Sequence, residues 1–541
     1  MNKKLLALVS LACVLPAQVK VNEAELERIK SEEMEHSQAM HTLHMLTDRF
    51  GPRLTGSPNF EAAANWVVKQ MKDWGFQNAH LEPWDFGHVG WLNMRASGYM
   101  MTPIHGDLTF RVLSWTPSTQ GTVNASAVEV EVPHGPPAPP PAEGAPARGG
   151  AGPQFLQPTR AEFDAGIAGL GAKVKGKIVL AGKAAVVPVN FTPAPLRRGE
   201  GDARGGFGGR GGRGAAPTPD PNRMTAAQVA EAFDQFLVAS GALLRINDAA
   251  MDHGLIRAFQ NRTYDLAKAV PTVVMRNDDY GRIERLLADG EDVKLEFNIV
   301  NETYPNGKTS YDVVGEIPGS DKADEIVMLG GHLDSWHSAT GATDNAIGST
   351  MMLEAARLIK ALGMKPRRTI RVALWSGEEE GLLGSAAYVK QHFGTAEEPK
   401  PEWAKLDCYF NIDSGTGRVR GASVFGPPEA ATILSGVMAR YKDWSMGTAT
   451  ATTSRATGGT DSTNFNAAGL PGIGLQQDPI EYGSFTWHTQ LDTYERIVPE
   501  DVKQAATEIA AMIWTVANLD EMIPRLPKDQ MPAPAVPRGG R

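Results

Sequence analysis

The sequence predicts an α/β protein whose sheet is covered by helices on both sides. From about residue 310, apolar runs with strand character alternate with helical runs. Buried strands are expected at EIVMLGG (from Glu325), TIRVALWS (from Thr369) and LDCYFNID (from Leu406). An amphipathic helix, STMMLEAARLIKAL, starts at Ser349 between the first two of these strands. Such alternation is typical of a sheet with helices on both faces.

Helices are also expected near both ends of the chain. Residues from about 20 to 50 carry many charges at helical spacing. Farther on, Ser57 suits an N-cap, Pro58 the first helical position and Gly75 the stop. The apolar face of that helix would be Phe60, Ala64, Val67, Val68 and Met71. After Pro499 a last long helix is predicted from Val502, Ala506, Ile509, Ile513 and Val516.

The region from about 95 to 300 has short β-like runs, among them GKIVLAG (from Gly176) and PTVVMRN (from Pro271). Two low-complexity stretches interrupt it, one starting at Pro133 and one at Arg197. Neither can bury enough apolar surface to offset the entropy of ordering, so both are expected to be disordered surface loops. The stretch from Arg197 contains an RGG-like run, and such runs can also contact RNA. The export signal predicted at the N-terminus, described below, favours a disordered surface loop instead.

Composition limits the class of protein. The 541 residues predict two or three domains, and 42% hydrophobic with 21% charged residues is the globular range. A net charge of −9 argues against a general nucleic-acid binder. No apolar run after the N-terminus is long enough to span a bilayer, so no stable membrane anchor is expected.

The N-terminus predicts export. Lys3 and Lys4 precede an apolar stretch, and Ala17 offers a small residue for cleavage, as in a signal peptide over residues 1–17. The protein would be secreted or periplasmic; the alternative is a buried N-terminal helix. Cleavage would remove Cys13 and leave Cys408 as the single cysteine, so an internal disulfide is not expected. Cys408 is interpreted as a small buried hydrophobe.

Acidic and histidine residues follow the predicted strands. His332 and Asp334 come directly after one strand, Glu378, Glu379 and Glu380 after the next, and Asp413 ends the third. Asp344 precedes a helix, and His488 precedes the last helix. Ligands of open α/β sheets collect at the carboxyl ends of strands.

Imidazole and carboxylate without thiolate suit zinc, manganese or cobalt. Two adjacent metals need a bridging carboxylate and terminal ligands on each. Asp344 can bridge, His332 and Asp413 can hold one ion, and Glu379 and His488 can hold the other. We therefore expect two Zn²⁺ ions per chain, with Mn²⁺ or Co²⁺ as possible substitutes.

Glu378 is left over as a catalytic carboxylate. Beside metal-activated water it would be the general base that takes a proton during attack on an amide and returns it to the leaving amine. Asp334 could orient the imidazole of His332 without itself binding a metal ion. Each motif alone would more often be structural; their order along one sheet makes the metal interpretation the stronger one.

These motifs resemble the M28 family of metallopeptidases, and most closely the plasma glutamate carboxypeptidase (carboxypeptidase Q) branch. The matching stretches are GGHLDSW, GATDN, RRTIRVALWSGEEEG, GGTDSTNFNAAGLPG and WHTQLDT. The resemblance implies the zinc-peptidase fold, with a mixed sheet flanked by helices and an inserted β-rich protease-associated domain. It also implies the same five metal ligands, Glu378 as the base, aminopeptidase or dipeptidase activity on peptides, and a possible homodimer.

The sequence patterns and the resemblance together divide the chain into five parts. These are residues 1–17 as signal peptide, 18–95 as the N-terminal helical part of the peptidase domain, 96–305 as the insert with disordered Gly/Pro-rich loops, 306–523 as the zinc peptidase domain and 524–541 as a disordered tail.

Two further positions, His337 and Asp461, are candidates for a role near the site. His337 occupies a place where the family leads us to expect an acidic residue, and it is a candidate extra polar group near the site or an inert loop histidine. Asp461 matches a family position behind the ligands or on the substrate side. Two other functions remain open: a one-zinc glutaminyl cyclase-like acyltransferase and a non-catalytic receptor-like binding protein.

Overall fold

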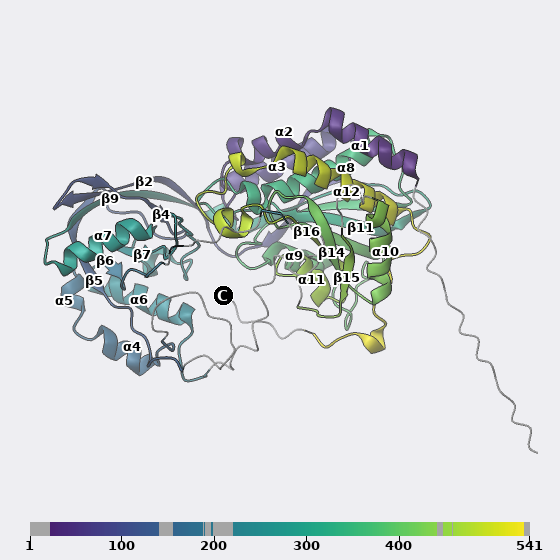
Figure 1. Cartoon of the computed structure of the whole chain (residues 1–541). Helices are drawn as coiled ribbons and strands as arrows, with labels where there is room; N and C mark the ends of the chain where they lie inside the picture. The colour runs from purple at the N-terminus through teal and green to yellow at the C-terminus, as the bar shows by residue number, and fades with distance from the viewer. Residues whose placement is uncertain are drawn as a thin grey trace, which may run out of the picture.

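The computed structural model describes residues 22–139, 155–187, 189, 196–197, 220–440, 447–456 and 458–534. Within these ranges the chain builds two eight-stranded sheets, each with helices of its own (Figure 1). We call the sheet at the right of Figure 1 with its helices the first body, and the sheet at the left with its helices the second body. The predicted signal peptide, with Cys13, lies outside the described residues.

The sheet of the first body is mixed. Its strands lie in the order β1-β10-β12-β11-β13-β16-β14-β15. The middle strands β12, β11, β13 and β16 are parallel to one another, whereas β10 and β14 run antiparallel to their inner neighbours. The strand bounds are β1 Gln77–Asp85, β10 Thr309–Ile317, β11 Lys322–His332, β12 Arg368–Trp375, β13 Leu406–Asn411, β14 Val419–Phe425, β15 Ala449–Thr452 and β16 Gly472–Gln477.

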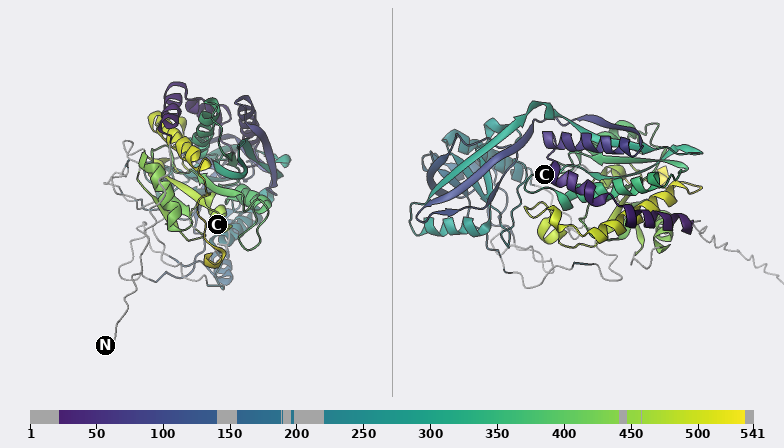
Figure 2. Two further views of the ribbon diagram at one scale, coloured as in Figure 1. Left: turned by 90° about the vertical axis from the view of Figure 1, so that its right-hand side faces the viewer. Right: turned by 90° about the horizontal axis from the view of Figure 1, so that it is seen from above.

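Helices cover both faces of this sheet, which confirms the predicted fold class (Figures 1 and 2). One face is covered by α1 Glu23–His36, α2 Ala39–His44, α3 Pro58–Asp73, α8 Ile347–Ala361, α10 Pro428–Met438 and α12 Pro499–Ala517. The other face is covered by α9 Leu383–His392 and α11 Ser462–Ala467. Cys408 on β13 is buried between the layers, as expected of a small hydrophobe.

The predicted signals explain where α3 begins and ends. The Ser57 hydroxyl accepts a hydrogen bond from the backbone N–H of Phe60 at 3.2 Å, and Pro58 is the first helical residue. Gly75 follows the helix with a φ of 82°, a conformation that favours glycine. The predicted apolar faces of α3 and α12 are both buried in the core.

The second body is built by residues 90–304. Its sheet has the order β3-β2-β9-β5-β6-β7-β8-β4, and β2 and β9 form a long antiparallel ribbon. The strands are β2 Gly90–Thr102, β3 Gly106–Asp107, β4 Phe110–Val112, β5 Val123–Val130, β6 Ile178–Ala181, β7 Leu244–Asp248, β8 Thr272–Met275 and β9 Lys294–Tyr304. Its helices are α4 Arg160–Ile167, α5 Gly171–Val174, α6 Ala226–Ser240 and α7 Asn277–Ala288. The sheet therefore starts inside the stretch 18–95, for which the sequence predicts an N-terminal helical part.

Parts of the segments expected to be disordered make defined contacts. Arg197, the first residue of the Gly/Arg-rich stretch, donates hydrogen bonds to Asp478 at 3.1 Å and to Asp501 at 2.6 Å. In the predicted tail, the Arg525 guanidinium donates to the Trp403 carbonyl at 2.8 Å, and Leu526 is buried. Arg197, Arg525 and Leu526 thus contact the first body, although they lie in segments whose composition predicts disorder. Most of both low-complexity stretches lies outside the described residues.

No helix in the described ranges is both long enough and apolar enough to cross a membrane.

A buried carboxyl pair on α1 and α8 gives a prediction on pH and stability. Burial, and then the neighbouring carboxylate of Glu354, raise the pKa of Glu33 to about 9. In the unfolded chain Glu33 loses its proton near pH 4.5, whereas the folded protein keeps it. The free energy of unfolding therefore falls as pH rises from about 4.5 to about 9.

Glu33→Gln keeps the shape of the protonated carboxyl group and cannot ionise, so it removes this pH-dependent loss of unfolding free energy. We expect the variant to exceed the parent by about 1–3 kcal/mol in unfolding free energy at pH 9, and by less at pH 6. Urea unfolding at the two pH values measures the difference. Glu35→Gln, on the exposed side of the same helix, is the matched control. An equal effect of both variants at pH 9 would contradict the prediction.

Candidate metal centre

Six of the predicted site residues converge at the carboxyl ends of β11, β12 and β13. His332 is the last residue of β11, Glu378 and Glu379 follow β12, and Asp413 follows β13. The parallel pairing of these three strands brings their ends to one edge of the sheet. Asp344 lies in the kinked turn Ala342–Ala346 before α8, and His488 follows the turn Tyr482–Thr486.

Asp344 lies between the two histidines. Its Oδ1 is 3.2 Å from Nε2 of His332, and its Oδ2 is 3.0 Å from Nε2 of His488. Each histidine has a second carboxylate beside it: Asp413 Oδ1 at 3.4 Å from His332 Nε2, and Glu379 Oε2 at 3.0 Å from His488 Nε2. The geometry thus has two halves that share one carboxylate.

Glu378 lies on the His332 side of the centre. Its Oε2 is 3.9 Å from His332 Nε2, and these two groups and Asp413 offer ligand atoms within 4.8 Å of one another. His332, Asp344 and Glu379 form a second such group. Glu378 is therefore close enough to act at the centre, although it is farther from the histidine than Asp344 and Asp413 are.

The donor set fits divalent metal ions. His332 Nε2 and Glu379 Oε1 are buried, and neither makes a hydrogen bond within the described part of the chain. Beside Asp344, Glu379 and His488 is a cavity of about 10 Å³, room for roughly one water molecule or ion. Neutral imidazole and carboxylate without thiolate are the ligands of zinc and similar ions.

The charges of the cluster favour a cation. Burial, and then the charges of Asp413, Glu379 and Asp461, raise the pKa of Glu378 well above its usual range, although His332 opposes them. Burial raises the pKa of Glu379 to about 7, and the Asp344 charge adds to this. Burial by itself lowers the pKa of His488, but the charges of Glu379 and Asp344 raise it to about 10. Several buried carboxylates thus compete for the positive charge of two imidazoles, and bound cations would relieve that competition.

Three comparisons with known proteins all find peptidases that resemble this chain. The model of peptidase family M28 matches residues 312–513, which contain all six residues of the centre. Carboxypeptidase Q of Mus musculus is 26% identical over 488 residues, covering 89% of this chain and 86% of that protein. The crystal structure of a peptidase M28 precursor from Shewanella amazonensis SB2B has a TM-score of 0.63 at 25% identity, covering 93% of this chain and 98% of that chain.

The chain therefore contains a peptidase family M28 domain, over residues 312–513. It is accordingly a metallopeptidase, as the donor set and the resemblance led us to expect. A zinc aminopeptidase from Bacillus subtilis shares the M28 fold, with a TM-score of 0.51 at 19% identity over 88% of this chain and 93% of its own.

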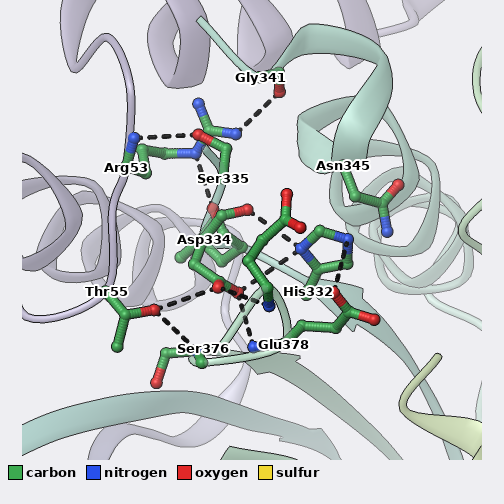
Figure 3. Close-up of polar contacts among 12 residues, drawn as sticks. Arg53, Thr55, His332, Asp334, Ser335, Gly341, Asn345, Ser376 and Glu378 are labelled. Atoms are coloured by element: carbon green, nitrogen blue, oxygen red, sulfur yellow. Dashed lines mark hydrogen bonds and ion pairs between the residues drawn. The ribbon is translucent and has the colours of Figure 1, made fainter. Parts of the chain in front are cut away.

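Asp334 contacts both His332 and the turn that carries the two glutamates of this M28 centre (Figure 3). The imidazole Nδ1 of His332 lies 3.1 Å from the backbone carbonyl of Asp334 and 3.5 Å from its carboxylate. The carboxylate itself accepts hydrogen bonds from the backbone N–H of Glu379 at 3.2 Å and the hydroxyl of Thr55 at 3.1 Å. Asp334 therefore holds the turn that carries the two glutamates as well as the histidine.

Sequence reasoning missed two positioning residues of the M28 site. The Asp492 carboxylate accepts hydrogen bonds from the backbone N–H and hydroxyl of Thr343 and from the backbone N–H of Asp344 at 3.2 Å. The buried Arg53 guanidinium donates to the carbonyls of Leu333 and Gly341, at the two ends of the loop between His332 and Asp344 (Figure 3). Asp492 lies in the WHTQLDT stretch and could have been singled out, whereas no pattern around Arg53 indicates its partners.

His337 and Asp461, the two further candidates from the sequence, contact other groups than the metal-facing atoms. His337 Nε2 contacts the Val112 carbonyl at 2.6 Å, and burial lowers its pKa to about 4, so this histidine joins the two bodies of the peptidase. Asp461 is fully buried and accepts a hydrogen bond from the Ser385 hydroxyl at 2.5 Å. This contact ties Asp461 to α9.

Proposed function

We propose that this protein is a secreted two-zinc exopeptidase that removes residues from the free amino end of peptides or splits dipeptides. The observation that carries the proposal is the position of Asp344, with one carboxylate oxygen toward His332 and the other toward His488. In this proposal His332 and Asp413 hold one ion, His488 and Glu379 hold the other, and Asp344 bridges them.

Bound zinc would supply Lewis-acid chemistry by acidifying a water and polarising the scissile carbonyl. Glu378 takes the proton of the attacking water and returns it to the leaving amine. Its Oε2 lies 3.9 Å from His332 Nε2, and it shares a group of candidate ligand atoms with His332 and Asp413, so its carboxylate is within reach of a water at the centre. Asp334 and Asp492 keep the turns of Glu378 and Asp344 in place through backbone N–H groups.

The exopeptidase type is supported by the relatives. An aminopeptidase and carboxypeptidase Q proteins are among the similar chains. We further propose that residues 1–17 are a signal peptide, that the second body is the inserted protease-associated domain, and that the first body is the catalytic domain. The Lys-rich, then apolar N-terminus supports the first of these, and the separate sheet of residues 90–304 supports the others.

A panel of peptides tests the proposal. We expect unblocked dipeptides and short peptides to be hydrolysed, chelation to abolish the activity and zinc to restore it. Matched N-acetylated peptides should resist, because an aminopeptidase or dipeptidase requires the free amine. Equal rates on acetylated and free peptides would exclude an exopeptidase acting at the amino end. Elemental analysis finding one zinc per chain would exclude the two-zinc centre.

A further inference from the structure

The two histidines of the centre are held in different ways. His332 Nδ1 contacts the carbonyl of Asp334 at 3.1 Å, the type of partner that fixes a metal-ligating imidazole. His488 Nδ1 is buried and makes no hydrogen bond with any residue that the structure describes. Apart from the contacts of Nε2 with Asp344 and Glu379, the orientation of the His488 ring must therefore come from packing and from its backbone.

The backbone of His488 is itself unusual. Its φ is 61°, in the left-handed region that side chains other than glycine seldom adopt. Such a conformation persists only where the surrounding structure holds it. The question is which residues hold the loop Trp487–Gln490.

The second body supplies these contacts. Its segment 254–260, which follows β7, lies against the loop 487–490 of the first body. Arg257 Nε donates to the Trp487 carbonyl at 3.1 Å, and its guanidinium lies 4.7 Å from the centre of the Trp487 ring. The backbone N–H of Ile256 donates to Gln490 Oε1 at 2.7 Å, and Gln490 Nε2 donates to the Gly254 carbonyl at 2.9 Å. Residues on both sides of His488 are thus tied to the second body.

The same segment also contacts the imidazole. The ring of Phe259 stands at 90° to the His488 ring with centroids 5.2 Å apart, and Phe259 also packs on Trp336 at 5.4 Å. On another side the Trp487 ring stacks on His488 at 4.1 Å. These aromatic contacts hold the ring so that Nε2 points at Asp344 and Glu379.

We propose that Arg257 and Phe259 of the second body are positioning residues for His488, so that the zinc position at Asp344, Glu379 and His488 forms fully only when the second body is docked on the first. The inference rests on the proposed two-zinc function. It assigns the second body a direct role in assembling the centre, although all six residues of the centre lie in the first body.

Zinc binding to the whole protein tests the inference. Arg257→Ala and Phe259→Ala should each weaken one of the two zinc sites by about 10- to 100-fold and leave the other at its parental affinity. Equilibrium dialysis at buffered free zinc, followed by elemental analysis, measures the two affinities. Arg257→Lys, which keeps one donor and the charge, should recover part of the loss.

The matched control is Arg111→Ala. Arg111 also belongs to the second body and donates to a carbonyl of the first, that of Ser338 at 2.9 Å. Among the described residues, no hydrogen bond or ring contact joins Arg111 to the loop 487–490. It should leave the ratio of the two zinc affinities unchanged. Thermal unfolding of each variant shows whether the fold is intact.

A second readout needs no metal. In the metal-free protein, modification of His488 by diethylpyrocarbonate, followed by mass spectrometry, should be several-fold faster in Arg257→Ala and Phe259→Ala than in the parent or in Arg111→Ala. Folded variants with parental zinc affinities and a parental modification rate would overturn the inference. A parent protein with one zinc would overturn the two-zinc proposal, while faster His488 modification in the two variants would still support the positioning role.

Discussion

Replacing Glu378 by glutamine should lower kcat by about 10²- to 10⁴-fold while the protein keeps its zinc. The amide has nearly the same shape as the carboxyl group but cannot take a proton from water at neutral pH. Glu378 is 3.9 Å from His332 Nε2, and the metal-facing contacts of Asp344 and Asp413 to that nitrogen are shorter. Loss of the base should therefore change turnover far more than metal content.

The measurement is kcat on an unblocked dipeptide together with zinc per chain. Glu380→Gln is the matched control, because Glu380 lies in the same turn and its pKa is also raised well above the usual range by burial, but we give it no part in proton transfer. Full activity in Glu378→Gln would show that another group is the base. A loss of zinc from that variant would instead make Glu378 a ligand.

Replacing Asp344 by asparagine should abolish measurable activity and weaken both of the proposed zinc sites together. The asparagine has one oxygen in place of two and no charge, so it cannot satisfy both halves of the centre at once. In the metal-free protein the two histidines also hold the pKa of Asp344 below its usual range despite its burial, which indicates how strongly the site favours the charged form.

Titration of metal-free protein with zinc measures this effect. Asp492→Asn should have a smaller effect, because it keeps the Asp344 carboxylate and changes only the group that holds the backbone of Thr343 and Asp344. We expect it to weaken binding by about 10- to 100-fold. An Asp344→Asn protein that still binds two ions tightly would refute the bridging role.

The strands and their chemistry could be predicted because both depend on local sequence. Apolar runs at Glu325, Thr369 and Leu406 mark β11, β12 and β13, and the polar residues that follow them must lie at the same edge of a parallel sheet. The pattern of residues was therefore enough to propose the candidate ligands as one group.

What could not be predicted depends on contacts between distant segments. Arg53 and the segment 254–260 have no pattern that indicates a partner hundreds of residues away, and the hydrogen bonds of Arg197 occur inside a stretch whose composition indicates disorder. The role of the Asp334 backbone carbonyl was also beyond sequence reasoning, because every residue has a carbonyl and only the fold decides where it points.

The order of strands also bears on how the protein folds and how it should be produced. β1 precedes the second body in the sequence, and β10 follows the second body. These two strands nevertheless pair with each other in the first sheet. The first sheet therefore cannot close during synthesis until residues beyond Thr309 have emerged, whereas the strands of the second body can pair earlier. A fragment that begins at residue 306 would lack β1 and expose the edge of β10, and an unpaired edge of this kind invites aggregation. The full chain is thus the form to express.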